Sequence, residues 1–278
     1  MTDKYAVIGN PIEHSKSPLI HQAFAQQTGK DISYERVLAP LDGFEVTIQT
    51  LVNHGFKGAN VTVPFKFEAY QLASRHTQRS TDARAANTLI FNAGEIGADN
   101  TDGAGLVRDI VQNLRLDIDG KRVLLIGAGG AAEGVAHPIA NENPAQLVVT
   151  NRNLEKAVAI VKRLELKTEY SRTLFATFSF EDLREHVFDL VINATSTGLS
   201  EAALPISSAI FVKGCLAYDM MYGRETPFMA QARTAGAKVA DGLGMLVEQA
   251  AEAFFVWHGI KPDTRYVIDM LRSQSLGQ

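Results

Sequence analysis

The stretch Val123-Leu-Leu-Ile-Gly-Ala-Gly-Gly-Ala-Ala132 decides the fold of this chain. Its four leading apolar residues are typical of a buried strand, and the alanines after the glycines are typical of a helix. Gly127, Gly129 and Ala132 match the G-x-G-x-x-G/A pattern, whose tight turn lets a pyrophosphate meet unpaired N–H groups at a helix N-terminus. The stretch predicts a dinucleotide site in a doubly wound α/β domain. A tight turn in another α/β protein is the alternative.

The turn lies in the middle of the 278-residue chain. About 120 residues precede it, which is enough for another domain, and the whole chain exceeds the usual size of one domain. We therefore expect an α/β protein with two domains separated by a cleft. Counting elements assigns residues 1–103 plus 241–278 to a domain that holds the substrate, and 104–240 to a Rossmann-type nucleotide-binding domain.

Composition restricts the function to small-molecule chemistry. Apolar residues make up 46% of the chain and charged residues 21%, which excludes a largely disordered protein, and a net charge of −4 gives no footprint for nucleic acid. We expect a cytoplasmic enzyme, because the apolar run at the start is too short for a signal peptide and no segment approaches the roughly 18 residues of a membrane span. The single cysteine, Cys215, is expected to be a buried apolar residue without chemistry.

Short apolar runs alternate with helical patterns, which predicts parallel strands joined by helical crossovers. The strands are expected at residues 5–9, 34–39, 58–63, 86–91, 95–98, 122–126, 146–150, 174–178, 188–193 and 215–220. The helices are expected at residues 19–27, 44–53, 131–140, 154–166 and 227–235, after Pro64, from about Thr101-Asp102, and from the 241–245 segment to about Trp257.

The end of the strand after the glycine turn selects the cofactor. An NAD site usually has a carboxylate there, but this strand ends in Thr150-Asn151-Arg152-Asn153. Arg152 offers a charged fork suited to a phosphate, and Lys156 adds a second positive charge one turn later. These residues predict NADP rather than NAD. If Asn153 only caps the next helix and both cations are solvated, the preference stays open.

Two later loops are expected to border the nicotinamide half of the cofactor. The run Asn193-Ala-Thr-Ser-Thr-Gly198, which contains Thr195, ends one apolar strand, and Tyr218-Asp-Met220 ends another. Ligands of a doubly wound sheet lie outside the carboxyl ends of its strands. Small polar residues also simply make turns, so spacing alone leaves both interpretations open.

Lys66 is a candidate acid-base residue. In Asn60-Val-Thr-Val-Pro-Phe-Lys66, Pro64 can begin a helix, which puts the lysine in a first turn where the helix dipole disfavours a cation. A destabilised ammonium suits proton transfer, although an ordinary surface lysine is the alternative. In Asn100-Thr-Asp-Gly103, Asp102 offers a carboxylate at another helix start, where it could equally be an N-cap.

Further polar residues could contact a substrate. Ser15 and Ser17 place two hydroxyls before a helix, suited to a carboxylate, although Ser17 could simply cap that helix. Asn87 interrupts an apolar strand and Gln249 an apolar helix, so both amides need partners if they are buried.

Together these motifs form a pattern that is more specific than any of them. They are Gly9-Asn-Pro-Ile-Glu-His-Ser-Lys-Ser-Pro18, Asn60 to Lys66, Asn87-Thr-Leu, Asn100 to Gly103, Asn193-Ala-Thr-Ser, Tyr218-Asp-Met and Asp241-Gly-Leu-Gly-Met-Leu-Val-Glu-Gln249. From about Tyr5 to His258, the chain resembles the shikimate dehydrogenase family. The resemblance implies an NADP-linked, reversible reduction of 3-dehydroshikimate to shikimate, on the route to chorismate and aromatic amino acids, without a metal.

The resemblance also implies roles for individual residues. Lys66 would donate a proton to the developing alkoxide as NADPH delivers hydride, with Asp102 orienting substrate and lysine. Ser15 and Ser17 would hold the substrate carboxylate. Its ring hydroxyls would be bound by Thr62, Asn87, Asp102, Gln249 and Tyr222. The cofactor site would be lined by Gly127, Ala128, Gly129, Gly130, Ala131, Asn151, Arg152, Asn153, Lys156, Met220 and Gly242.

Some positions depart from the family pattern. Glu133 stands where an arginine is common, and its charge is expected to weaken the attraction for phosphate. Lys156 stands where some members have a second arginine, which loses the fork. Arg84-Ala-Ala replaces a usual Gly-Ala-Val, and Gln78 replaces a frequent acidic residue, and neither change touches the expected chemistry.

Two competing functions remain. A quinate/shikimate dehydrogenase would share the serine, lysine and aspartate motifs and tolerate NAD, and Asn151 and Arg152 argue against it. A non-catalytic NADP-binding sensor would keep the fold alone, and Lys66 and Asp102 argue against that. No nucleic acid or membrane partner is expected, and a homodimer is compatible with the resemblance.

Overall fold

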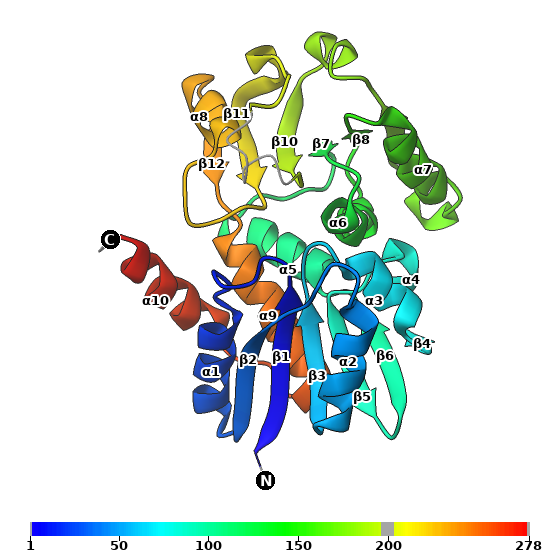
Figure 1. Ribbon diagram of the computed structural model, residues 1–278. Coiled ribbons are helices and arrows are strands. Elements are labelled where there is room, and N and C mark those ends of the chain that lie inside the picture. Colours follow the sequence, from blue (N-terminus) through cyan, green and yellow to red (C-terminus); the bar gives the residue numbers. More distant parts are fainter. Residues whose placement is uncertain (1, 196–202, 277–278) are drawn as a thin grey trace. The chain divides into compact units, whose positions relative to one another are not determined.

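The computed structural model describes residues 2–195 and 203–276. The chain divides into two compact units, of which unit 1 is Met1–Gly105 with Leu246–Gln278 and unit 2 is Leu106–Met245. The chain therefore leaves unit 1 after its first part and returns to it within a late helix, as the colours of Figure 1 show.

The described part of unit 1 forms a six-stranded mixed sheet in the order β2-β1-β3-β5-β6-β4. β1 is parallel to β2 and to β3, which is the predicted crossover arrangement. β5 is antiparallel to β3, which departs from the predicted parallel strands, and the turn at 92–94 joins β5 to β6 as an antiparallel hairpin. The strands are β1 (Asp3–Gly9), β2 (Ile32–Leu38), β3 (Phe56–Val61), β4 (Arg75–His76), β5 (Thr88–Asn92) and β6 (Glu95–Asp99). The helices are α1 (Ser17–Thr28), α2 (Phe44–Asn53), α3 (Lys66–Leu72), α4 (Gln78–Ala83) and α10 (Thr264–Leu276).

Two helices cross the division between the units, α5 (Asp102–Arg108) and α9 (Leu243–His258). The last turns of α9 pack on the unit 1 sheet, where the Trp257 indole donates to the carbonyl of Leu89 at 3.1 Å and stacks on Tyr5. Gly58 is required beneath that indole, since a Cβ there would lie 2.5 Å from Trp257 Nε1. Helix α2 supplies Phe44 and Ile48, and the N-cap of α3 supplies Phe65, to a separate cluster with β1, β3 and β5.

Within the residues described, unit 2 forms a six-stranded sheet in the order β12-β11-β10-β7-β8-β9, and every pairing is parallel. Counted along the unit, this is the 3-2-1-4-5-6 order of the Rossmann fold, so the predicted doubly wound fold is confirmed. The strands are β7 (Arg122–Ile126), β8 (Gln146–Thr150), β9 (Leu174–Thr177), β10 (Phe188–Asn193), β11 (Phe211–Asp219) and β12 (Lys238–Ala240). The helices are α6 (Gly130–Asn141), α7 (Leu154–Glu165), α8 (Pro227–Thr234), the π-helix η1 (Asp109–Asn113), and the 3-10 turns η2 (Thr168–Tyr170), η3 (Asp182–Glu185) and η5 (Ser208–Ile210).

The strand order of unit 2 reverses between β7 and β10, which are neighbours in the sheet. Helices α6 and α7 pack on one face of this sheet, where Ala132, Val135 and Ile160 belong to one apolar cluster. Helix α8 packs on the other face through Phe228 and Met229. Ligands of such sheets lie beyond the carboxyl ends of the strands at this reversal.

Long apolar runs were the elements best predicted from sequence. The bounds of β7, β8, β10 and α2 are those expected, whereas β4, α4, η1, β12 and α10 were not predicted. β4 is only the exposed pair Arg75-His76, which is too short to show the apolar alternation of a strand. A π-helix differs from an α-helix in backbone bonding rather than in residue pattern. No helix in the described part of the chain has the length and apolar character needed to cross a membrane.

His21 of α1 is fully buried among aromatic rings of unit 1. It stacks on Tyr34 with ring centroids 4.2 Å apart and planes 7° apart, and it lies close to Phe254 and Trp257 of α9. Burial lowers the pKa of His21 to about 3. The imidazole is therefore neutral in the folded protein at neutral pH.

This burial predicts loss of stability in mild acid. In the unfolded chain His21 regains an ordinary pKa near 6.5 and binds a proton that the folded state refuses, so stability is greatest above that pH and falls as pH drops toward 3. The slope from this residue is at most about 1.4 kcal/mol per pH unit. We expect His21→Phe to lessen the fall in urea-unfolding free energy between pH 7 and pH 5. His54→Gln, which changes an exposed histidine, is the matched control, and equal slopes for His21→Phe and the parent would contradict the prediction.

Candidate active site

Lys66 and Asp102 form a close, largely buried ion pair. The Nζ atom of Lys66 lies 2.5 Å from Oδ2 of Asp102, and the two side chains are 13% and 6% exposed. Lys66 is the first residue of α3 and Asp102 the first of α5, so both stand in the predicted first turns. The expectation that Pro64 begins the helix is wrong, because the N-cap of α3 is Phe65. The Asp102 side chain does not cap α5, because its oxygens accept from Lys66 and from Asn87. The pair can hold an ammonium proton close to a bound oxygen and away from bulk water.

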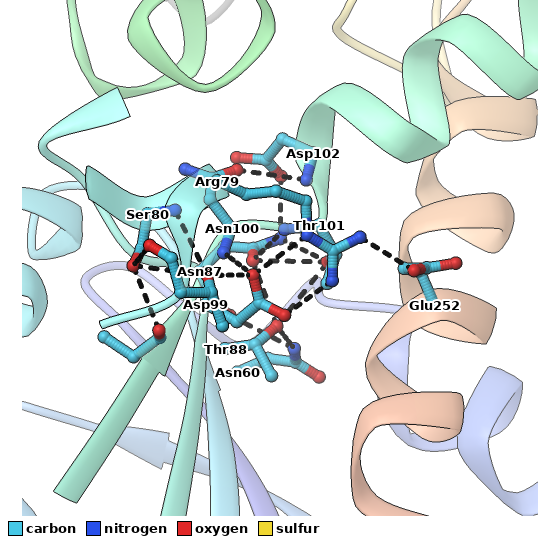
Figure 2. Close-up of polar contacts among 12 residues, drawn as sticks. Asn60, Arg79, Ser80, Asn87, Thr88, Asp99, Asn100, Thr101, Asp102 and Glu252 are labelled. Atoms are coloured by element: carbon cyan, nitrogen blue, oxygen red, sulfur yellow. Dashed lines mark hydrogen bonds and ion pairs between the residues drawn. The ribbon is translucent and has the colours of Figure 1, made fainter. Parts of the chain in front are cut away.

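Asn87, directly before β5, joins the carboxylate to α9. Its Nδ2 lies 2.9 Å from Asp102 Oδ1, 2.9 Å from Thr101 Oγ1 and 3.1 Å from Gln249 Oε1. An amide nitrogen has two hydrogens, so three acceptors compete for two bonds. Its Oδ1 accepts from the Thr101 N–H at 2.8 Å, and Figure 2 shows Asn87 with the hydrogen bonds that link it to Thr101 and Asp102. The buried amide of Asn87 thus contacts both Asp102 and the partly buried amide of Gln249.

Gly105 permits α5 to approach α9 at Gln249. A Cβ on Gly105 would lie 2.7 Å from both the Cβ and the backbone nitrogen of Gln249. The Gln249 Nε2 donates to the carbonyl of Leu246 at 2.7 Å, which fixes the orientation of its amide. Sequence reasoning missed Gly105, because a glycine inside a helix carries no mark of what packs against it.

Ser15 and Ser17 lie together at the start of α1. The hydroxyls are 3.2 Å apart, and the Ser17 N–H donates to Ser15 Oγ at 3.3 Å. Arg36 of β2 holds this loop by donating from Nε and Nη2 to the carbonyl of Ser15 at 2.8 and 2.6 Å. The alternative that Ser17 caps the helix is wrong, because the N-cap residue is Lys16 and no side chain caps this end. Sequence reasoning also missed Arg36, which resembles an ordinary exposed strand residue.

Thr62 and Tyr222 are the other two residues predicted to contact the substrate. Thr62 directly follows β3, its N–H donates to the carbonyl of Ile8, and its hydroxyl makes no hydrogen bond with the residues described. Its methyl group excludes any side chain at Gly9, where a Cβ would lie 2.5 Å away. Tyr222 belongs to unit 2, in the loop after β11.

The glycine turn of unit 2 has the backbone that the motif requires. Gly127 has φ of +123°, a conformation that side chains rarely adopt, and a Cβ there would lie 3.1 Å from the carbonyl of Ala194. Gly129 has open space where a Cβ would be, and α6 begins at Gly130 without a side-chain cap. The N–H groups of its first turn can therefore bind an anion, so the residues present fit a dinucleotide pyrophosphate.

The end of β8 presents two cations. Asn153 caps α7 by accepting from the Glu155 N–H at 3.1 Å, and Asn151 donates to the carbonyl of Asn153 at 2.8 Å. The capping interpretation of Asn153 is therefore confirmed. Arg152 and Lys156 are exposed, and neither forms an ion pair with any residue in 2–195 or 203–276. Both are thus available to an anion in addition to the cap.

Glu133 is not an isolated negative charge. It lies in the first turn of α6, and its Oε2 accepts from Nη2 of Arg163 on α7 in an ion pair. The arginine and glutamate side chains are 20% and 12% exposed. The expected repulsion of phosphate by Glu133 is thus opposed by a cation on the neighbouring helix. The sequence did not reveal this partner, since Arg163 is thirty residues away and resembles a solvated helix residue.

The residues at the carboxyl ends of the neighbouring strands β10 and β11 are joined by a hydrogen bond. Asn193 accepts from the N–H and the hydroxyl of Thr195 at 3.1 and 2.7 Å and donates to Asp219 at 3.1 Å. Burial raises the pKa of Asp219 above its ordinary value. A Cβ on Gly242 would overlap the carbonyl of Met220, so these two predicted cofactor residues are in contact. The rest of the predicted loop, residues 196–198, lies outside the described residues.

Two further observations concern thiol and metal-ligating groups. Cys215 is fully buried, and burial raises the pKa of its thiol to about 12, so it offers no thiolate. No cluster of three or more histidine, cysteine, aspartate or glutamate side chains in the described parts of the chain could hold a metal ion.

Three family models match the chain. Residues 7–89 match the shikimate dehydrogenase substrate binding domain, residues 106–204 match shikimate / quinate 5-dehydrogenase, and residues 242–272 match the shikimate 5'-dehydrogenase C-terminal domain. The matched segments together span most of the sequence.

Individual proteins match over nearly the whole chain. A shikimate dehydrogenase (NADP(+)) from Methylobacillus flagellatus is 56% identical over 98% of this chain and 99% of its own length. The crystal structure of an Ael1 enzyme from Pseudomonas putida has a TM-score of 0.88 and 44% identity, covering 97% of this chain and 98% of its own. The shikimate 5-dehydrogenase of Thermus thermophilus, solved in complex with NADP(H) and shikimate, has a TM-score of 0.84 and 29% identity, covering 98% and 99%.

Proposed function

The chain belongs to the shikimate dehydrogenase family, and on that premise we propose that Lys66 and Asp102 are its catalytic residues. The reaction is the NADPH-linked, reversible reduction of 3-dehydroshikimate to shikimate, on the route to chorismate and the aromatic amino acids. The observation that carries the assignment is the 2.5 Å ion pair, held largely out of water beside the Asn87 amide.

Proton transfer is the part of the reaction that this pair supplies. Bound NADPH supplies the hydride. Lys66 donates a proton from Nζ to the oxygen that becomes an alkoxide as the carbonyl is reduced, and it takes the proton back in the oxidation direction. Asp102 holds the ammonium in place and accepts a hydrogen bond from the substrate with the rest of its carboxylate. Its position at the start of α5 gives this orientation a rigid support.

The polar groups around the pair form the proposed substrate site. Ser15 and Ser17 bind the substrate carboxylate, since both hydroxyls lie at one helix start and can donate. Asn87 and Gln249 bind ring hydroxyls, exchanging part of their mutual contact for contact with the ligand. Thr62 and Tyr222 complete this set as proposed contacts.

Each unit has a proposed role. Residues 1–103 and 241–278 bind the substrate, and residues 104–240 bind NADP. Support comes from the position of Lys66, Asn87, Asp102 and Gln249 in unit 1 and of the glycine turn in unit 2. A homodimer and a cytoplasmic location remain predictions from the sequence.

NADP selectivity comes from the cations at the end of β8. Arg152 and Lys156 bind the 2′-phosphate, and Asn151 and Asn153 shape the loop that carries them. The first turn of α6, next to Gly129, would hold the pyrophosphate. Thr195, Met220 and Gly242 would border the nicotinamide half. Arg163 keeps Glu133 from opposing the phosphates.

The assignment of Lys66 is tested by Lys66→Ala. Loss of the proton donor is expected to lower kcat by at least about a hundredfold, with the far-UV circular dichroism unchanged. Lys57→Ala is the matched control, because it removes an exposed lysine from β3 of the same unit. Near-normal turnover of Lys66→Ala would refute the role.

The substrate and cofactor are tested by initial rates of the four combinations of shikimate or quinate with NADP or NAD. We expect the highest kcat/KM for shikimate with NADP, because Arg152 and Lys156 gain energy only from a 2′-phosphate. Efficient oxidation of quinate would favour the quinate/shikimate dehydrogenase alternative. Equal use of NAD would refute the phosphate site.

The Glu133–Arg163 pair makes a prediction for affinity. Arg163→Ala leaves the glutamate without this cation near the phosphate site, and the Kd for NADP+ measured by calorimetry is expected to rise about threefold to tenfold at low salt, with a smaller change for NAD+. Adding Glu133→Gln is expected to restore the affinity. Lys162→Ala removes an exposed charge from the same helix and serves as control. Equal effects of Arg163→Ala and Lys162→Ala would contradict the prediction.

A further inference from the structure

Arg79 connects two carboxylates of unit 1 that lie on different elements. From α4, its Nε and Nη2 donate to Asp99 at 3.0 and 2.5 Å, and its Nη1 donates to Glu252 of α9 at 2.7 Å. Asp99 is 2% exposed and Glu252 is 12% exposed, whereas Arg79 is 35% exposed. Figure 2 shows the guanidinium between the end of β6 and the helix that carries Glu252. Arg79 has no role in the proposed reaction itself.

The first arm of the connection leads to Asp102. Asp99 ends β6, and its Oδ1 accepts from the N–H of Asn100 at 2.7 Å. Asn100 accepts in turn from the Asp102 N–H at 3.1 Å and donates to the carbonyl of Ala85 at 2.9 Å. A continuous series of hydrogen bonds therefore runs from the guanidinium to the backbone of the catalytic aspartate.

The second arm leads to Gln249. Glu252 lies three residues after Gln249 on α9, so the two side chains are neighbours on one face of the helix. Both arms meet again at Asn87, whose Nδ2 contacts Asp102 and Gln249. The guanidinium and the Asn87 amide are therefore two cross-links between the same two segments, the one carrying Asp102 and the one carrying Gln249.

The planar geometry of the guanidinium is as important as its charge for joining Asp99 to Glu252. Two parallel bonds to Asp99 leave the third nitrogen directed at Glu252, and a lysine ammonium has no such fixed geometry. Without the guanidinium, the mostly buried carboxylates of Asp99 and Glu252 lose the cation that they share, and like charges repel. The loop before Asp102 and the helix of Gln249 would then move apart.

We propose that Arg79 is a positioning residue that sets Asp102 and Gln249 at the spacing that shikimate requires. This inference rests on the proposed roles of those two residues. A displacement of about 1 Å at a reacting group can cost on the order of a hundredfold in rate, so a cross-link outside the site can govern turnover. Arg79 touches neither substrate nor cofactor in this proposal.

The two arms predict different kinetic effects. Glu252→Gln weakens the arm to Gln249 and is expected to raise the KM for shikimate about fivefold with kcat little changed. Arg79→Gln removes both arms and is expected to lower kcat at least about tenfold as well as raise KM. Arg79→Lys keeps the charge without the fork and is expected to fall between Arg79→Gln and the parent. The Kd for NADP+, measured by calorimetry, is expected to stay unchanged in all three.

A matched control lies on the same sheet. Arg75 pairs with Glu95, at the opposite end of β6 from Asp99, and both side chains are well exposed. Arg75→Gln therefore removes an arginine from an ion pair with β6 that has no path to Asp102 among the hydrogen bonds of the described residues. It is expected to leave kcat and KM as in the parent protein.

Three outcomes would overturn the proposal. The first is an Arg79→Gln protein that loses stability but keeps the parent kcat and KM, which is what a merely structural role predicts. The second, decisive if Arg79→Gln does not fold, is an unchanged shikimate KM in Glu252→Gln. The third is equal effects of Arg75→Gln and Arg79→Lys. If Lys66→Ala is inactive but Arg79→Gln has the parent kcat and KM, only the positioning role of Arg79 is refuted. If Lys66→Ala is fully active, the proposed function is refuted.

Discussion

The ion pair between Lys66 and Asp102 is the constraint on which the rest of unit 1 depends. Each residue begins a helix, and moving both charges out of water costs free energy that the pair recovers only if its remaining hydrogen-bonding groups are satisfied. Asn87 donates a hydrogen bond to Asp102, and the same amide nitrogen contacts Gln249 on α9. The polar site is thus also the joint between the sheet and α9, so the same contacts serve folding and chemistry.

In unit 2, the proposed cofactor site is formed mainly by backbone groups rather than by side chains. Gly127 takes a conformation that other residues avoid, and Gly129 leaves open space in front of the first turn of α6. Charged side chains of α6 and α7 then determine the electrostatic environment of that backbone. Glu133, which the sequence marks as unfavourable for a phosphate, is paired with Arg163 on the next helix, so a residue's charge could not be interpreted without its neighbour.

Sequence reasoning succeeded where a signal is local. The strand, glycine turn and helix of unit 2 occupy one continuous stretch, and Lys66 and Asp102 each stand at a helix start that proline and polar residues mark. It failed where the partner is distant. Arg79 and Arg163 resemble solvated helix residues until Asp99, Glu252 and Glu133 are placed beside them. The need for glycine at position 105 also could not be predicted, because only the packing of α9 shows why a side chain is excluded there.

The division of unit 1 into two stretches of chain has a consequence for biosynthesis. Unit 2 is encoded entirely between them, so a ribosome finishes it before releasing the part of α9 that bears Gln249. Domains tend to fold as units as they emerge. Here the nucleotide-binding unit can complete its sheet first, while Asn87 and Arg79 still await Gln249 and Glu252. The protein therefore becomes competent only after α9 has emerged, with the active site among its last parts to assemble.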